Sequence, residues 1–140
     1  MYQVVLDTNV LVTALRSKLG ASYLLLDRLG SANWRPNLTV ALALEYEAIL
    51  KRERISFGLD EKDIDDVLDG ICSQSSLHRQ YFVWRPIAAD PDDDLVLEAA
   101  IASNSDFILT YNKRDLRASR QFGIECLTPK EFLILVGELP

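Results

Sequence analysis

The sequence predicts an α/β fold, a three-layer α/β/α sandwich with a central, mainly parallel sheet. Short apolar segments typical of buried strands alternate along the chain with longer segments in which apolar residues recur every three or four positions, as in helices. The 140 residues, 49% hydrophobic and 26% charged, have a usual length and composition for one compact domain. We therefore expect residues 1–140 to form a single domain.

The first half of the chain is expected to supply two strands and four helices. In chain order these are a strand at residues 4–6, helices at 9–17 and 21–29, a strand at 34–38, and helices at 40–52 and 60–72. Gly30 is a usual residue just past a helix end, and Thr39 is a favourable N-cap for the helix that follows it.

The second half is expected to supply three strands and two helices. In chain order these are a strand at residues 81–85, a helix at 90–103, strands at 107–110 and 124–127, and a final helix that Thr128 opens. Pro91 suits the first turn of its helix, and Glu131, three residues after Thr128, completes a capping-box pattern.

Composition and charge exclude several classes of protein. No apolar run approaches the roughly 20 residues of a membrane span, and no signal-peptide start is present, so we expect a cytoplasmic protein without a membrane partner. The net charge of −6 argues against a broad basic face that holds nucleic acid. Cys72 and Cys126 lack metal or redox spacing and are expected in the core, and the lone His78 has no partner for a catalytic triad.

Asp7 is the first residue with a candidate chemical role, because ligands of parallel α/β sheets bind at the carboxyl ends of strands. A carboxylate at the end of a buried strand needs a partner, and a metal ion would be one. Capping of the helix that begins near Asn9 is the alternative. The same rule directs attention to residues 110–112, which follow a later strand.

Two further acids adjoin apolar helical segments. Glu45 follows the apolar residues 40–44, so it either points into a cleft or is simply exposed. Asp94 shares a helix face with Glu98, one turn later, and at least one of them needs a partner, although acids in a first turn also arise from the helix dipole alone. A site built from such oxygens would suit Mg²⁺ or Mn²⁺.

Basic residues are concentrated late in the chain. Four of the fifteen Lys and Arg residues lie between residues 113 and 120. In an acidic protein this concentration suits contact with a phosphate backbone, and a solvated charged helix gives the same pattern.

Four segments occur in an order that is more specific than any one of them. They are residues 4–11 with the motif Asp-Thr-Asn, residues 45–50 beginning at Glu45, the Asp-rich residues 90–100, and residues 106–116 with a Thr-x-Asn motif after a strand. In this order, over nearly the whole chain, the sequence resembles the PIN domain. The resemblance is closest to the toxin components of bacterial toxin–antitoxin pairs.

The resemblance implies a ribonuclease in which water activated by Mg²⁺ or Mn²⁺ hydrolyses a phosphodiester bond. Asp7, Glu45 and Asp94 match the metal ligands of the family, and they would be catalytic together with Asn112. The family usually has a fourth acid at the position of Asn112. Asn offers a carbonyl oxygen but no charge, so a second metal should bind more weakly.

The resemblance also implies partners: an RNA substrate, a second copy of the chain in a homodimer, and an antitoxin protein. The residues expected to hold the substrate are Thr8, Lys113, Arg114 and Arg117. Asp93 or Asp115 would compensate for the missing fourth acid. The alternative is a PIN fold that no longer cuts and serves as an RNA- or protein-binding module, which the missing acid and the acidic surface favour.

Overall fold

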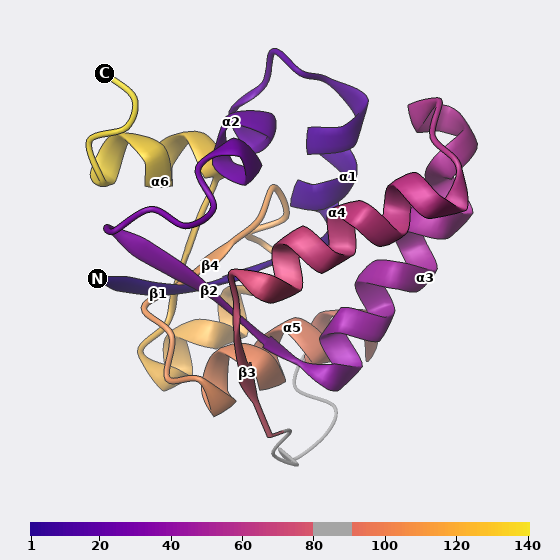
Figure 1. Ribbon diagram of the computed structural model, residues 1–140. Coiled ribbons are helices and arrows are strands. Elements are labelled where there is room, and N and C mark those ends of the chain that lie inside the picture. Colours follow the sequence, from indigo (N-terminus) through magenta and orange to yellow (C-terminus); the bar gives the residue numbers. More distant parts are fainter. Residues whose placement is uncertain (80–90) are drawn as a thin grey trace.

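The computed structural model describes residues 1–79 and 91–140, which form a five-stranded parallel sheet covered by helices (Figure 1). The strands are β1 (Tyr2–Leu6), β2 (Trp34–Thr39), β3 (Ser76–His78), β4 (Phe107–Leu109) and β5 (Glu125–Leu127). The helices are α1 (Thr8–Arg16), α2 (Ala21–Asp27), α3 (Val40–Phe57), α4 (Glu61–Ser73), α5 (Pro91–Ala102) and α6 (Pro129–Leu135), with a 3₁₀ helix, η1 (Arg117–Phe122).

The sheet has the strand order β3-β2-β1-β4-β5. The chain therefore moves outward from β1 to β3 and then returns to the other side of β1 for β4 and β5. Leu6 of β1 is paired with Leu109 of β4, so these two strands end side by side. A crevice that can hold a ligand is expected at such a reversal of strand order, outside the carboxyl ends of the strands.

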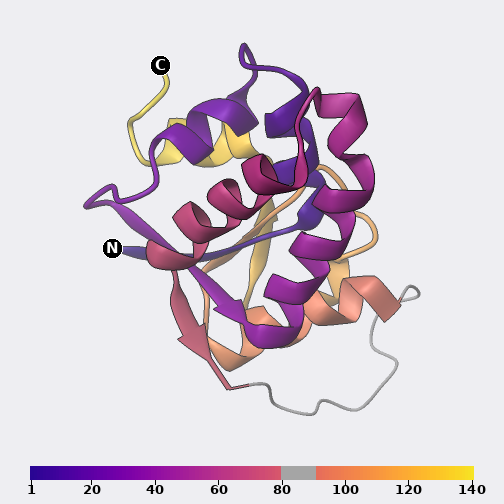
Figure 2. The same cartoon turned by 45° about the vertical axis from the view of Figure 1, so that its right-hand side comes forward.

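Helices lie on both faces of the sheet (Figures 1 and 2). Helix α5 covers one face, and α1, α2, α4 and α6 lie over the other. Val4, Val5 and Leu6 of the central strand are at most 1% exposed, as expected for a parallel strand that is covered on both sides. The predicted three-layer α/β fold is thereby confirmed.

The predicted helix ends are partly confirmed. The Thr39 hydroxyl accepts a hydrogen bond from the Leu42 backbone N–H at 3.1 Å, and Thr128 and Glu131 form the expected capping box. Helix α3 runs to Phe57, past the predicted end at residue 52, and stops where Gly58 adopts a left-handed conformation with φ of 71°.

Three other predictions have different outcomes. Strand β3 was not expected, because three residues are too few to show a strand period. The predicted strand at residues 81–85 lies outside the described residues. The expectation that Cys72 is a core residue is wrong: α4 buries Ile64, Leu68 and Ile71, and Cys72, one position further round the helix, is exposed.

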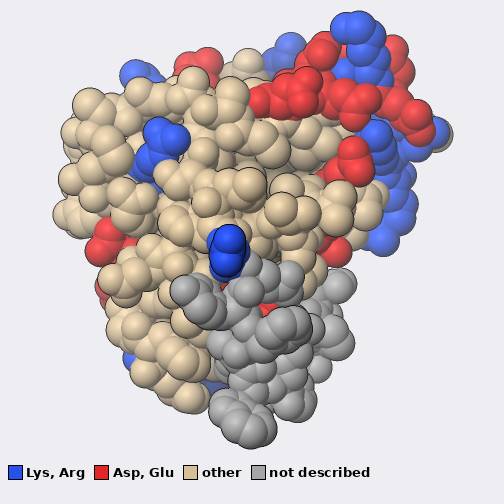
Figure 3. Space-filling model, turned by 60° about the horizontal axis from the view of Figure 1, so that its bottom comes forward, with Lys and Arg blue, Asp and Glu red and all other residues tan. Residues whose placement is uncertain are grey.

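Charge on the surface is unevenly distributed. Figure 3 shows one face on which Lys, Arg, Asp and Glu gather at one end, over the end of α3 and the start of α4, while the middle of the face carries few charges. Within residues 1–79 and 91–140, no helix has the length and apolar character needed to cross a membrane.

Candidate active site

A cleft of about 340 Å³ opens at the carboxyl end of β1. It gathers side chains from α1, α3, the start of α5 and the loop after β4. The lining residues are Asp7, Thr8, Asn9, Val12, Arg16, Glu45, Ile49, Arg52, Glu53, Asp93 and Asn112. Three of the four residues predicted to be catalytic, Asp7, Glu45 and Asn112, therefore meet in one place.

Asp7 is the most buried acid of the cleft, at 8% exposed. Burial raises the pKa of Asp7, and hydrogen bonding by the Thr110 hydroxyl and by the nearby backbone N–H groups of Thr8 and Asn9 only partly opposes this shift. Asp7 occupies the N-cap position of α1, but its side chain makes no hydrogen bond of full capping geometry with that helix. Its well-formed side-chain hydrogen bond is with Thr110, which holds the carboxylate at the cleft.

Thr110 holds Asp7 in place. The Thr110 hydroxyl donates to Asp7 Oδ2 at 2.7 Å and accepts from the Asn112 backbone N–H at 2.8 Å, and the residue is fully buried. The sequence predicted Thr110 at the end of a strand but did not predict its hydrogen bond to Asp7. Once β1 and β4 are known to be neighbours, the pairing of Leu6 with Leu109 supplies that contact.

Glu45 reaches the cleft because of the way α3 packs. Leu42, Tyr46 and Leu50, at most 1% exposed, form the buried face of the helix. The Tyr46 hydroxyl donates to the backbone carbonyl of Leu6, the residue before Asp7. This bond ties α3 to the end of β1, so that Glu45 lies half-buried at the cleft beside Asp7.

The acids at the start of α5 differ in position. Asp93 lines the cleft, whereas Asp94 is not among the lining residues and is 2% exposed. Adjacent helical residues point about 100° apart, so one position decides which carboxylate faces the cleft. Glu98 is buried with Asp94, as expected for residues that share a helix face.

Asn112 takes the place of the expected fourth acid. Its side-chain Nδ2 donates to Asp115 Oδ2 at 2.6 Å, which leaves its carbonyl oxygen as the group available to a ligand. Asp115 therefore orients Asn112 and does not itself line the cleft.

The predicted substrate-binding residues are dispersed. Thr8 lines the cleft. Lys113 does not: it forms an ion pair with Glu131, and this contact lowers the pKa of that carboxyl. Arg114 and Arg117 are exposed outside the cleft.

Two cleft arginines were missed by the sequence argument, Arg16 at the end of α1 and Arg52 in α3. Both look like ordinary surface residues along the chain. Only the packing of α1 against α3 brings them to one place, and no local sequence signal reveals it.

The cleft has the donor chemistry of a site for a hard divalent cation. Carboxylate and amide oxygens are the protein ligands that Mg²⁺ and Mn²⁺ prefer. Among the residues that the structure describes, no three acidic, His or Cys side chains form a group that could hold a metal ion. The donors fit in kind, and the side chains would have to draw closer together around an ion.

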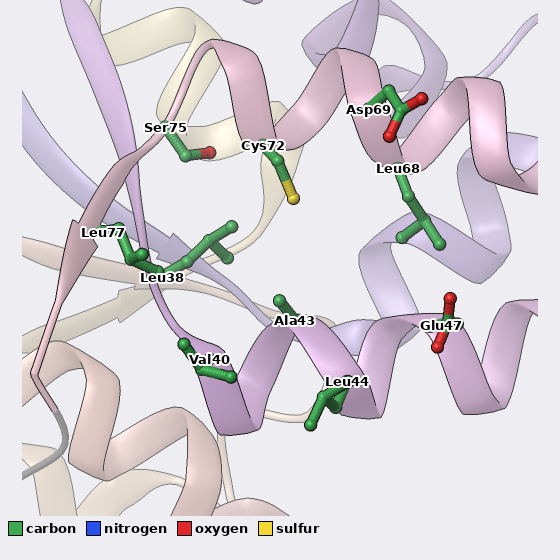
Figure 4. Close-up of a pocket in the computed structure, with 10 residues that line it drawn as sticks. All are labelled: Leu38, Val40, Ala43, Leu44, Glu47, Leu68, Asp69, Cys72, Ser75 and Leu77. Atoms are coloured by element: carbon green, nitrogen blue, oxygen red, sulfur yellow. The ribbon is translucent and has the colours of Figure 1, made fainter.

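A second hollow lies between α3 and α4 and has a different character (Figure 4). It has a volume of about 370 Å³, and its lining residues are Leu38, Val40, Ala43, Leu44, Glu47, Leu68, Asp69, Cys72, Ser75 and Leu77. Cys72 and Leu68 point from α4 toward α3. This apolar groove has two carboxylates but no converging set of polar groups, so the acidic cleft is the better candidate for chemistry.

The family model for the PIN domain matches residues 3–114, which include every acid of the cleft. The chain therefore belongs to the PIN domain family, whose members are generally nucleases. The five-stranded order described above is consistent with this fold. A comparison with curated proteins gives no match.

Proposed function

We propose that this protein is a metal-dependent ribonuclease that hydrolyses phosphodiester bonds in the acidic cleft. The observation that carries the proposal is the convergence of Asp7, Glu45, Asp93 and Asn112, from four separate parts of the chain, on one cleft at the reversal of strand order. The family supports nuclease activity in general, and RNA as the substrate is our inference.

Asp7, Glu45 and Asp93 would hold Mg²⁺ or Mn²⁺, with the carbonyl oxygen of Asn112 as a neutral donor. Asp94 adjoins this set from the buried side of α5. The ion would neutralise the substrate phosphate and lower the pKa of a water that attacks it. Thr110 keeps Asp7 oriented, and its hydrogen bond favours the ionised carboxylate that a cation requires.

We further propose that the protein is the toxin of a bacterial toxin–antitoxin pair, acts as a homodimer and is silenced by an antitoxin protein. The sequence resemblance described above supports this role. Purification of the protein with and without the product of a neighbouring small gene, followed by measurement of mass in solution, would test both partners.

The nuclease proposal is tested by incubating a panel of single-stranded and structured RNAs with the protein in Mn²⁺, Mg²⁺ or EDTA. Asp7→Asn, Asp93→Asn and Asp94→Asn are compared with the unchanged protein. Cleavage that needs the metal and is lost in Asp7→Asn is expected. Absence of cleavage in every metal, or equal cleavage by Asp7→Asn, would contradict the proposal.

A binding module that no longer cuts is the second candidate, and Asn112 is the observation that favours it, because a neutral side chain weakens the attraction for metal. The discriminating measurement is thermal stability with added Mn²⁺. A working site gains stability because the ion binds the folded state preferentially, and a degenerate site gains little.

A further inference from the structure

The cleft contains a pair of arginines that share one carboxylate. Arg16 Nη2 lies 3.3 Å from Glu53 Oε2, and Arg52 Nε lies 3.8 Å from Glu53 Oε1. All three residues line the same cleft as Asp7. Among the described residues that line this cleft, only Arg16 and Arg52 are basic, in a protein whose net charge is −6.

Structural support is a poor explanation of this arrangement. The side chains of Arg16 and Arg52 are 53% and 68% exposed, and ion pairs this exposed contribute about 0–1 kcal/mol to stability. Helix α1 already packs against α3 through apolar residues, so the pairs are not needed to hold the two helices together.

We infer that Arg16 and Arg52 bind a backbone phosphate of the substrate, next to the phosphate that is cut. When no substrate is bound, Glu53 forms ion pairs with both arginines. The inference rests on the proposed function, because it names the substrate contacts of the same cleft. Arginine is suited to this task, since its planar guanidinium binds phosphate through two parallel hydrogen bonds.

The position of the arginines indicates which phosphate they contact. Arg16 lies eight residues after Thr8 in α1, and Arg52 lies seven residues after Glu45 in α3, which places them about 10–12 Å further along the helix axes. This offset favours the phosphate next to the one held beside Asp7, because both arginines extend from backbone positions about two turns further along their helices. We therefore expect a substrate that extends beyond the bond that is cut, as an internal segment of a polynucleotide does.

Glu53 competes with the substrate for the two arginines. A phosphate that enters must displace the carboxylate, so removal of the Glu53 charge should tighten binding. This opposite sign separates the proposal from a structural role, in which loss of either partner of an ion pair has the same effect.

The test is binding of a fluorescein-labelled single-stranded RNA of about 12 nucleotides, within the range of single-strand sites, measured by anisotropy in EDTA as salt is varied. The variants are Arg16→Gln, Arg52→Gln and Glu53→Gln. Arg28→Gln, at an exposed arginine that caps α2 away from the cleft, is the matched control. Melting temperatures confirm that each variant is folded.

Each arginine variant should weaken binding about ten-fold or more, as expected for loss of a charge-assisted hydrogen bond, and should reduce the salt slope by about 0.7. Glu53→Gln should tighten binding, and Arg28→Gln should leave it unchanged. A dinucleotide, which has no neighbouring phosphate, should bind the arginine variants and the unchanged protein equally.

The inference is overturned if the arginine variants bind the RNA as Arg28→Gln does, if Glu53→Gln weakens binding, or if no RNA binding occurs. Because EDTA is present, this result is independent of cleavage. A protein that binds RNA through the arginines but cuts nothing in Mn²⁺ would contradict the nuclease proposal, while the assignment of Arg16 and Arg52 to a backbone phosphate would stand.

Discussion

The acidic cleft and the apolar groove are of similar size and share a helix, yet only one of them gathers groups that can do chemistry. Helix α3 presents a different face to each. Leu42, Tyr46 and Leu50 face the core, Glu45, Ile49, Arg52 and Glu53 face the cleft, and Val40, Ala43, Leu44 and Glu47 face the groove.

The two hollows differ in what surrounds the shared helix. At the cleft, α3 meets the carboxyl ends of β1 and β4, where Asp7 and Asn112 are fixed by Thr110. At the groove, α3 meets α4, which contributes Leu68 and Cys72 (Figure 4). The reversal of strand order, and not the size of a hollow, therefore determines where the candidate chemistry lies.

The sharpest test of this comparison uses two glutamates of α3. Glu45→Gln should lower the rate of RNA cleavage by about 100-fold or more, the scale seen when a polar group of a catalytic site is removed. Glu47→Gln, only two residues away but facing the groove, should change the rate less than about two-fold. The rate is measured as kcat with saturating RNA. Equal losses of kcat in both variants would contradict the assignment of chemistry to the cleft face of α3 alone.

Removal of the Tyr46 hydroxyl should have the next largest effect. Tyr46→Phe leaves the buried carbonyl of Leu6 without its donor, which should reduce the free energy of unfolding by about 1–2 kcal/mol. Urea denaturation measures this loss. An unchanged midpoint would mean that Tyr46 does not anchor α3 to the end of β1.

The ionised carboxylate of Asp7 should destabilise the folded protein when no metal is bound. Because burial raises its pKa in the folded state, the stability linked to Asp7 is fully present below its unfolded-state pKa and is lost as pH rises through the higher folded-state value. Asp7→Asn should therefore be more stable than the unchanged protein at neutral pH in EDTA. The difference should shrink as pH is lowered, and thermal melts across pH that show the opposite trend would refute this account.

The smallest effect is expected in the groove. Leu44 is 60% exposed, so Leu44→Gln should change the free energy of unfolding by less than about 0.5 kcal/mol and leave RNA cleavage unchanged. Urea denaturation and the cleavage assay check both. A large loss of cleavage would show that the groove takes part in the reaction.

Much of this arrangement is predictable from local sequence. The strand before Asp7, the Thr39 cap and the Thr128 capping box follow from patterns within a few residues. Asp93 and Asp94 illustrate the limit of local sequence, because it cannot show which of two adjacent helical positions faces the cleft without knowledge of how α5 packs. The proximity of Arg16 and Arg52 could not be predicted from local sequence, since it depends on the contact between α1 and α3, which are far apart in sequence.

The proposed chemistry requires a divalent ion in the cleft between β1 and β4. Paramagnetic broadening of backbone amide signals by Mn²⁺ in a nitrogen-15 spectrum would locate that ion. Signals of Asn9, Glu45 and Asn112 should broaden first, and those of Cys72 and Leu77 should persist. Broadening centred on the groove, or an unchanged spectrum at saturating Mn²⁺, would contradict the proposed metal site.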